Sequence, residues 1–247
     1  MKYHYNLHIH SCLSPCADNE MTPNNIAGMA MLAGYQIAAL TDHNSCKNCP
    51  AFFEACRRVG VIPVAGMELT TAEDIHLICL FETLEAALCF DDAVGRHRIL
   101  IPNRTDIFGE QLILDGDDNV TGREEHLLSN ATGLMLEEAA ALARDYSAAV
   151  YPAHVDREGN GILAILGDLP EEPAFSAAEF HDGGKIPEYL AKYPRLAGKT
   201  AIVCSDAHFL EGLPDAAYCF EWEEAGEDEI RRRLIRLLSG LETEGNG

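Results

Sequence analysis

Short apolar runs that end in, or lie close to, a histidine or a carboxylate recur along the whole chain. In a strand, residues two apart point to the same face, so His8 and His10 form one same-face pair and Asp206 and His208 form another. A chain that repeatedly brings such groups to strand ends builds one polar site, which favours a metal cluster in a hydrolytic enzyme. The runs cover residues 3–10, 37–43, 61–68, 75–79, 148–154 and 201–208.

Helical patterns separate most of these runs. Thr22 and Pro23 have the residue types of a helix N-cap and first helical position, and Gly34 follows the last apolar residue of that pattern. Alternation of strands and helices predicts parallel strands with helical crossovers. In a barrel of parallel strands, the loops after the strands converge on one face, where active sites lie. Further helices are predicted over residues 50–59, 84–90, 134–146, 162–166, 186–193 and 229–238, and a further strand over 175–180.

The segment from Gly95 to Asn130 breaks the alternation. Residues 111–120 are typical of a strand followed by a polar turn, and we expect an insertion around 95–130 near the mouth of the site. No internal repeat, low-complexity tract or linker divides the chain. The pattern therefore predicts a single domain over residues 1–247.

Composition excludes several functional classes. The chain is 47% hydrophobic and 23% charged, as expected for a globular protein with a substantial core. No apolar stretch approaches the roughly 18 residues that span a bilayer, so no membrane partner is expected. Because the first strand pattern starts directly after Lys2, no signal peptide is predicted and the expected compartment is cytoplasmic.

The formal net charge of −22 bears on the choice of partner. Such a surface repels polyanions, which argues against nucleic acid. A small phosphorylated substrate remains compatible, since bound divalent cations reverse the field inside a cleft.

Nine cysteines in a chain of this size do not indicate a disulfide framework. Four of them follow proposed ligands and could hold a structural zinc, although free thiols are the preferred interpretation. One of the four, Cys16, could instead contact the active-site metals. The four are Cys12, Cys16, Cys46 and Cys49.

A series of motifs between residues 3 and 210 resembles the PHP (polymerase and histidinol phosphatase) superfamily. The series reads His8-Ile9-His10-Ser11, then Thr41-Asp42-His43-Asn44, a glutamate at the end of the next strand, and Ser205-Asp206-Ala207-His208. The resemblance implies a distorted (β/α)7 TIM-like barrel with two or three divalent metal ions at its C-terminal face. It also implies hydrolysis of phosphate monoesters or diesters.

The resemblance further assigns ligands to each ion. It implies that Glu68 bridges a first and a second ion and that His43 and His208 hold a third. The first ion would take His8, His10, Glu68 and Asp206, and the second would take Glu68, His76 and His154.

The sequence departs from the family pattern after the first motif. The family supplies an aspartate or histidine five or six residues later, where this chain has Pro15 and Cys16. Asp18 or Cys16 could replace that ligand, and Asp18 is favoured because a hard carboxylate suits a hydrolytic cluster. The ligand types suit zinc, manganese or iron better than calcium.

A mechanism follows for such a cluster. A hydroxide bridging two ions would attack phosphorus, and His208 or His43 would protonate the leaving group. Arg157 is expected to bind the phosphate with two hydrogen bonds, or else to form a surface salt bridge. Asp42 is expected to support a metal-bound histidine, and His181 is a weaker candidate for a contact in the cleft.

These features predict a metal-dependent phosphoesterase acting on a small phosphorylated metabolite or nucleotide. Two alternatives remain: a nuclease or 3′-end phosphatase acting on nucleic acid, and a catalytically inactive metal-binding module. Neither the substrate nor the oligomeric state can be predicted from these residues.

Overall fold

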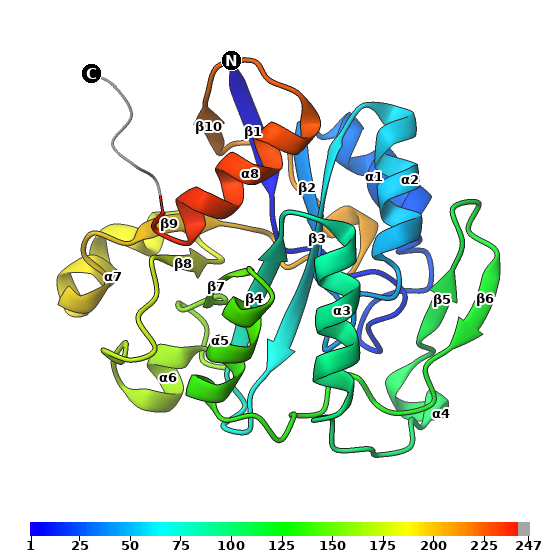
Figure 1. Cartoon of the computed structure of the whole chain (residues 1–247), viewed down its shortest axis with the longest axis horizontal. Helices are drawn as coiled ribbons and strands as arrows, with labels where there is room; N and C mark the ends of the chain where they lie inside the picture. Colours follow the sequence, from blue (N-terminus) through cyan, green and yellow to red (C-terminus); the bar gives the residue numbers. More distant parts are fainter. Residues whose placement is uncertain (242–247) are drawn as a thin grey trace.

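A curled sheet forms the centre of the molecule (Figure 1). The structure, a computed structural model, describes residues 1–241. Six strands follow one another in the order β10-β1-β2-β3-β4-β7, and a parallel pair, β8 and β9, forms a second sheet. The strands are β1 (Lys2–Asn6), β2 (Ile37–Leu40), β3 (Ile62–Thr70), β4 (His76–Phe81), β7 (Ala149–Pro152), β8 (Ala177–Phe180), β9 (Thr200–Val203) and β10 (Cys219–Glu221).

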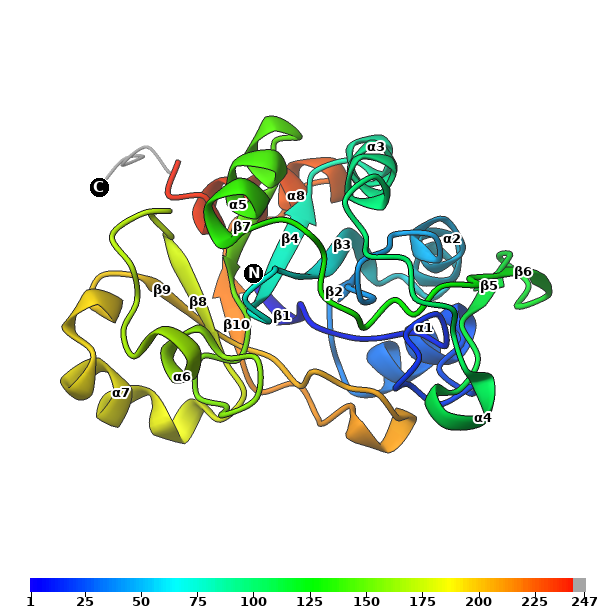
Figure 2. The ribbon, with the colours of Figure 1, turned by 90° about the horizontal axis from the view of Figure 1, so that it is seen from below.

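Helices cover the outside of this sheet, which confirms the predicted α/β, TIM-like barrel class (Figure 2). Helix α8 (Glu227–Leu238) packs on the opposite, inner face, where Ile230 and Leu234 contact inward side chains of the strands, as its amphipathic pattern requires. The other helices are α1 (Pro23–Leu32), α2 (Cys49–Val59), α3 (Leu84–Gly95), α5 (Leu136–Asp145), α6 (Ile162–Leu166) and α7 (Ile186–Lys192), with 3-10 turns at Gly183–Lys185, Pro194–Leu196 and Leu210–Gly212.

The predicted ends of α1 and α2 are confirmed. The side chain of Thr22 accepts a hydrogen bond from the Asn25 amide, and Pro23 begins α1. Gly60 ends α2 with a φ of 79°, in the left-handed region that glycine adopts without strain. Among the described residues, no helix is long and apolar enough to cross a membrane.

The expectation of uniformly parallel strands is wrong at β4. The chain returns from β3 to β4 through a short turn, so the two strands pair antiparallel, with Thr70 opposite His76. A parallel connection needs a dozen or more residues, and the five residues of this turn cannot supply them. Because β4 runs in reverse, His76 at its start lies at the sheet edge where β3 ends.

The first strand is also shorter than predicted. Strand β1 ends at Asn6, and residues 7–10 continue as a loop with one isolated bridge between Ile9 and Ala207. This bridge brings the chain after β9 against the chain after β1. Strand β10, which was not predicted, pairs antiparallel with β1 at the sheet edge.

Residues 95–130 form the predicted irregular segment. It contains α4 (Thr105–Phe108) and a hairpin of β5 (Leu112–Leu114) and β6 (Val120–Arg123). The Leu112 amide donates to the carbonyl of Cys12, and Asn48 donates to the carbonyl of Leu112. The segment therefore covers the loops that follow His10 and His43.

Candidate metal centre

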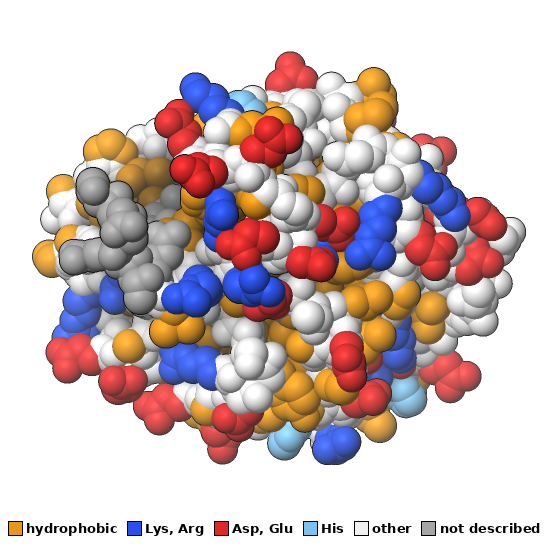
Figure 3. Space-filling model, turned by 45° about the horizontal axis from the view of Figure 1, so that its top comes forward, with side chains coloured by type: hydrophobic (Ala, Val, Ile, Leu, Met, Phe, Trp, Pro, Cys, Tyr) orange, Lys and Arg blue, Asp and Glu red, His pale blue; other side chains and the backbone are white. Residues whose placement is uncertain are grey.

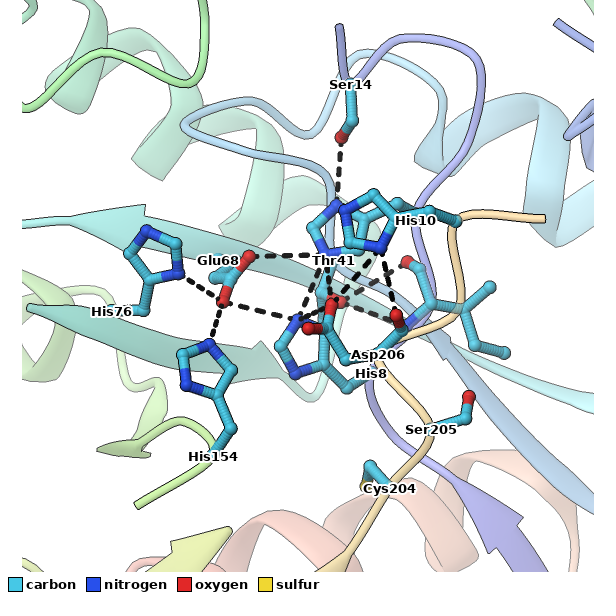
Figure 4. A network of polar contacts seen from close by, with 12 residues as sticks. His8, His10, Ser14, Thr41, Glu68, His76, His154, Cys204, Ser205 and Asp206 are labelled. Carbon is cyan, nitrogen blue, oxygen red and sulfur yellow. Dashed lines mark hydrogen bonds and ion pairs between the residues drawn. The ribbon is translucent and has the colours of Figure 1, made fainter. Parts of the chain in front are cut away.

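Four side chains of the sequence motifs meet at one buried point (Figure 4). The Nε2 atoms of His8 and His10 are 3.0 Å apart, and they lie 3.2 and 3.1 Å from Oδ1 of Asp206. The His10 Nε2 atom is also 3.2 Å from Oε2 of Glu68. These residues come from the loops after β1 and β9 and from β3, so the predicted convergence of the chain's two ends is present.

Glu68 is the centre of a wider group. Its Oε1 atom is 2.7 Å from Nδ1 of His76 and 3.1 Å from Nε2 of His154. Its Oε2 atom is 3.1 Å from Nδ1 of His43. Glu68 thus lies between the group at His8 and the histidines of β4 and β7, in the position that a bridging carboxylate needs.

A third group consists of His10, His43 and His208, which could hold one ion together. The ring centroids of His10 and His208 are 4.2 Å apart, and those of His10 and His43 are 4.6 Å apart. The three imidazoles come from the loops after β1, β2 and β9. Four of the motif histidines, His43, His76, His154 and His208, line one cavity, while His8 and His10 are fully buried.

Two of the candidate ligands have unusual backbone dihedral angles. His154 has a φ of 27° and Asp206 a φ of 49°, which are uncommon for residues with a side chain. Such conformations are costly and are found where the surrounding structure enforces them, often at functional sites. Here they turn the chain at the ends of β7 and β9, where the two side chains reach the cluster.

The geometry fits divalent metal ions. Ligand atoms bound about 2.0–2.2 Å from a common ion lie roughly 2.9–3.5 Å from each other, as these atoms do. The buried side-chain atoms of the described residues that have no hydrogen-bond partner include Nδ1 of His43, Oε2 of Glu68 and Oδ1 of Asp206. Buried polar atoms are normally paired, so these atoms fit ligands of ions.

The electrostatics of the cluster divide its histidines into two kinds. Burial would lower the pKa of His10, but hydrogen bonds to Asp206 and Glu68 raise it to about 9. Burial would also lower the pKa of His8. The negative charges of Glu179 and Asp206 outweigh burial and hold this pKa well above its ordinary value. Burial and the charge of His10 lower the pKa of His208 to about 4. In the metal-free protein, protons on His8 and His10 therefore neutralise the carboxylates.

Metal loading should consequently release protons. Since the pKa values of His8 and His10 are raised, an ion that binds their nitrogens must displace at least one proton at pH 7. The apparent metal affinity should then rise with pH at least up to about pH 9, the pKa of His10. Titration calorimetry in two buffers with different ionisation enthalpies measures the release. Identical heats in both buffers would contradict this assignment.

Glu179 in β8 is a residue that the sequence analysis missed. It is fully buried, and its Oε1 atom accepts a hydrogen bond from Nδ1 of His8 at 2.7 Å. This contact orients the His8 ring so that its Nε2 atom faces the cluster. The available signal was a lone carboxylate in the apolar run from Ala177 to Phe180, where a charge has no reason to be buried unless it has a partner.

The substitution Glu179→Leu should weaken metal binding by about 10–100-fold, because His8 loses the acceptor that orients its ring. Equilibrium dialysis against manganese measures the affinity directly. Glu124→Gln is the control. Glu124, a residue of the insertion, is also largely buried, but its carboxylate pairs with Lys47 rather than with a histidine of the cluster. Equal affinity of the Glu179→Leu and native proteins would rule out the orienting role.

Asp42 supports His10 through an intermediate. Its carboxylate accepts hydrogen bonds from the Ser11 amide and from the hydroxyls of Ser11 and Ser14. The Ser14 oxygen in turn lies 2.9 Å from Nδ1 of His10. The expected supporting role of Asp42 is therefore consistent with this geometry, although the contact with the histidine is indirect.

Asp18 and Cys16, the two candidates for the remaining ligand, both lie outside the three groups. Asp18 is exposed, and its Oδ1 atom accepts a hydrogen bond from the amide of Glu20. Cys16 is exposed as well. Neither residue therefore belongs to a candidate group, although burial and the charge of nearby Glu68 raise the pKa of the Cys16 thiol. The preference for Asp18 stays a prediction.

No disulfide joins the cysteines of the described residues, and the preference for free thiols over a structural zinc stays a prediction. The thiols of Cys46 and Cys49 lie 3.2 and 3.7 Å from the carbonyl oxygen of Gly66. Cys12 packs elsewhere, with Leu112 and Leu114 of the hairpin. Among the described residues, no candidate metal group contains a cysteine.

A cavity of about 270 Å³ opens above the ligands and is lined by Arg157 and Asn160 besides the histidines. The guanidinium of Arg157 pairs with Asp206 and lies 3.0 Å from Nδ1 of His181. Arg157 therefore lines the cavity, and His181 lies next to it. The predicted placement of Arg157 next to the site agrees with this geometry.

Comparison with known proteins places these observations in context. The family model of the PHP domain matches residues 6–146. No curated protein matches the chain significantly by sequence.

Solved structures share the fold at low identity. The lesion-specific endonuclease Q of Pyrococcus furiosus superposes with a TM-score of 0.64 at 18% identity, covering 98% of this chain and 57% of that one. An endonuclease Q complex with a 27-mer duplex has a TM-score of 0.59 at 17% identity, covering 94% of this chain and 56% of that one. An amidohydrolase from Chromobacterium violaceum with bound sulfate gives 0.59 at 16% identity, with 92% and 96% covered. The chain thus spans little more than half of the endonuclease Q chains.

Proposed function

This chain belongs to the PHP domain family, and on that premise we propose that it is a metal-dependent phosphoesterase acting on a small phosphorylated metabolite or nucleotide. The observation that supports the proposal best is the buried cluster around Glu68, with Arg157 at its mouth. A cluster kept only for stability would not need an arginine beside an open cavity.

The first proposed ligand set is one of the groups in the structure: one ion would be held by His8, His10, Glu68 and Asp206. A second ion would be held by Glu68, His76 and His154, which contact one another through Oε1 of Glu68, although the compact group there is His43, Glu68 and His76. The third group, around His43 and His208, could hold a further ion. Imidazole and carboxylate ligands suit zinc, manganese or iron.

Bound ions of this kind lower the pKa of a water molecule to supply the nucleophile, and they neutralise charge on a phosphate. Arg157 would add two parallel hydrogen bonds to the phosphate oxygens, because its planar guanidinium matches their geometry. Asp206 now occupies one side of that guanidinium, and a bound phosphate would compete for it.

Neither His208 nor His43 has the properties of a general acid that protonates the leaving group. With its pKa near 4, His208 is neutral at pH 7, and its Nδ1 atom lies 2.9 Å from the carbonyl oxygen of Asp206. A neutral imidazole that donates through Nδ1 presents a lone pair at Nε2, so it accepts rather than gives a proton. Burial lowers the pKa of His43 too. We therefore favour ligand roles for both over protonation of the leaving group.

Nucleic acid is the second candidate substrate. The fold shared with endonuclease Q over 98% of this chain favours it, and the expectation against nucleic acid is not supported by that comparison. The net charge of −22 remains the opposing observation, and on the face seen in Figure 3 basic side chains lie beside acidic ones. Arg57 and Glu227, for example, form an ion pair at 3.0 Å.

A paired assay tests the two candidates. The protein is stripped with a chelator, reloaded separately with manganese and zinc, and assayed with p-nitrophenyl phosphate and with single-stranded and abasic duplex DNA. We expect chelation to abolish phosphate release and reloading to restore it. The proposal fails if the reloaded protein releases no product from p-nitrophenyl phosphate, and cleavage of DNA by the same protein would establish the second candidate.

A further inference from the structure

A second cavity, of about 530 Å³, lies where the barrel fails to close. Strand β1 pairs with β2 and β10, and β9 pairs only with β8 within the described chain, so the single bridge from Ile9 to Ala207 joins the two sheets there. The cavity is bounded by Tyr5 and Asn6 of β1, by the end of β9, and by the segment 211–218. It is called the seam cavity below.

The seam cavity adjoins the metal site. Ser205 lines the seam cavity, and the next residue, Asp206, lines the cavity above the ligands. His181, also in the seam cavity, contacts Arg157 of the metal site at 3.0 Å. Small-molecule pockets measure about 300–1,000 Å³. The metal site at about 270 Å³ is below that range, whereas the seam cavity lies within it.

The lining of the seam cavity has a clear chemical character. Carboxylates come from Asp182, Glu211 and Asp215, and hydroxyl groups come from tyrosines and from Ser205. Among the described residues that line it, there is no lysine or arginine. Asn6 is buried and donates to the Ser205 oxygen at 2.7 Å, which leaves the Ser205 hydroxyl proton available to a ligand.

We propose that the seam cavity receives the alcohol part of the phosphate ester and selects uncharged or cationic, hydroxylated alcohols over anionic ones. This inference rests on the proposed function, since the phosphate must sit at the metal site. Hydroxyl or ammonium groups of the alcohol would donate to the carboxylates, whereas a second anionic group would be repelled by them. Arg157 and His181, at the boundary, would contact the phosphate end.

Three esters with one carbon skeleton test this selection. Glucosamine 6-phosphate, glucose 6-phosphate and 6-phosphogluconate have a cationic, a neutral and an anionic alcohol respectively. Calorimetry on manganese-loaded protein gives the dissociation constant of each, and inorganic phosphate serves as the probe of the metal site alone. We expect glucosamine 6-phosphate to bind at least about ten-fold more tightly than 6-phosphogluconate.

Variants link this preference to the seam cavity. The double substitution Glu211→Gln with Asp215→Asn should reduce the ratio between the two esters by about five-fold or more, because two of the three carboxylates lose their charge. Asp145→Asn, at the exposed end of α5, is the control for net charge. Ala217→Trp, which fills the cavity, should weaken all three esters relative to inorganic phosphate.

The outcomes separate the two levels of inference. If the ratio between the esters is the same in the native protein and in the double variant, or if Ala217→Trp weakens phosphate as much as the esters, the assignment of the cavity is wrong. If the esters bind as expected but p-nitrophenyl phosphate is not hydrolysed, the proposed function is wrong instead. Circular dichroism of each variant establishes that it is folded.

Discussion

Replacing Glu68 with alanine should reduce kcat/KM for p-nitrophenyl phosphate by at least about 10³-fold, a loss typical of removing a central catalytic group. Five histidines lie within 3.4 Å of its carboxylate. They come from β4 and from the loops after β1, β2 and β7, so no other residue contacts as many parts of the site. Without this carboxylate, the groups around His8 and around His76 lose the atom pair that they share.

Glu68→Gln refines the result. Glutamine keeps the shape but not the charge, and a neutral amide is a poor ligand for a divalent ion. Both variants should therefore lose bound manganese as well as activity, which elemental analysis after gel filtration measures. Glu124→Gln, at a largely buried carboxylate of the insertion, should retain both. Full activity of Glu68→Ala would falsify the proposed bridging role.

Phe52→Ala should lower the free energy of unfolding by about 3–5 kcal/mol, the usual cost of removing a large aromatic side chain from a core. Phe52 is fully buried in α2, on the face that also buries Cys49 and Cys56. The neighbouring side chains belong to the larger core cluster beneath the helices. They cannot fill the whole volume of a phenyl ring, so a cavity remains.

Urea denaturation of the metal-free protein measures this effect without a contribution from bound ions. Phe108→Ala is the matched control, because Phe108 in α4 is 42% exposed. That variant should lie within about 0.5 kcal/mol of the native protein. An equal decrease in the free energy of unfolding of both variants would mean that burial of the phenyl ring does not determine the destabilisation.

Local signals in the sequence were sufficient for most helices and for the order in which the candidate ligands occur along the chain. Thr22, Pro23 and Gly34 determine the ends of α1 through contacts within a few residues, which is why a sequence pattern can predict them. The histidines and carboxylates at strand ends were predictable for the same reason, since alternation and strand ends are local properties.

Features that depend on distant partners could not be predicted. The predicted direction of β4 was wrong because an apolar run has the same pattern in either direction. Only the short turn from β3 decides that the two strands pair antiparallel. Glu179 was missed because its partner, His8, is 171 positions away. The exposure of Asp18 likewise depends on how the loop after His10 folds.

The β3–β4 hairpin also has a consequence for assembly. Glu68 and His76 are eight positions apart, so one short hairpin brings these two ligands together. Asn6 and Ser205, next to the remaining ligands, are 199 positions apart, and their contact requires closure of nearly the whole chain. Because the entropy cost of loop closure grows with the length of the loop, the hairpin half of the site can order early. The capacity to hold the first ion arises last, when the two ends of the chain meet.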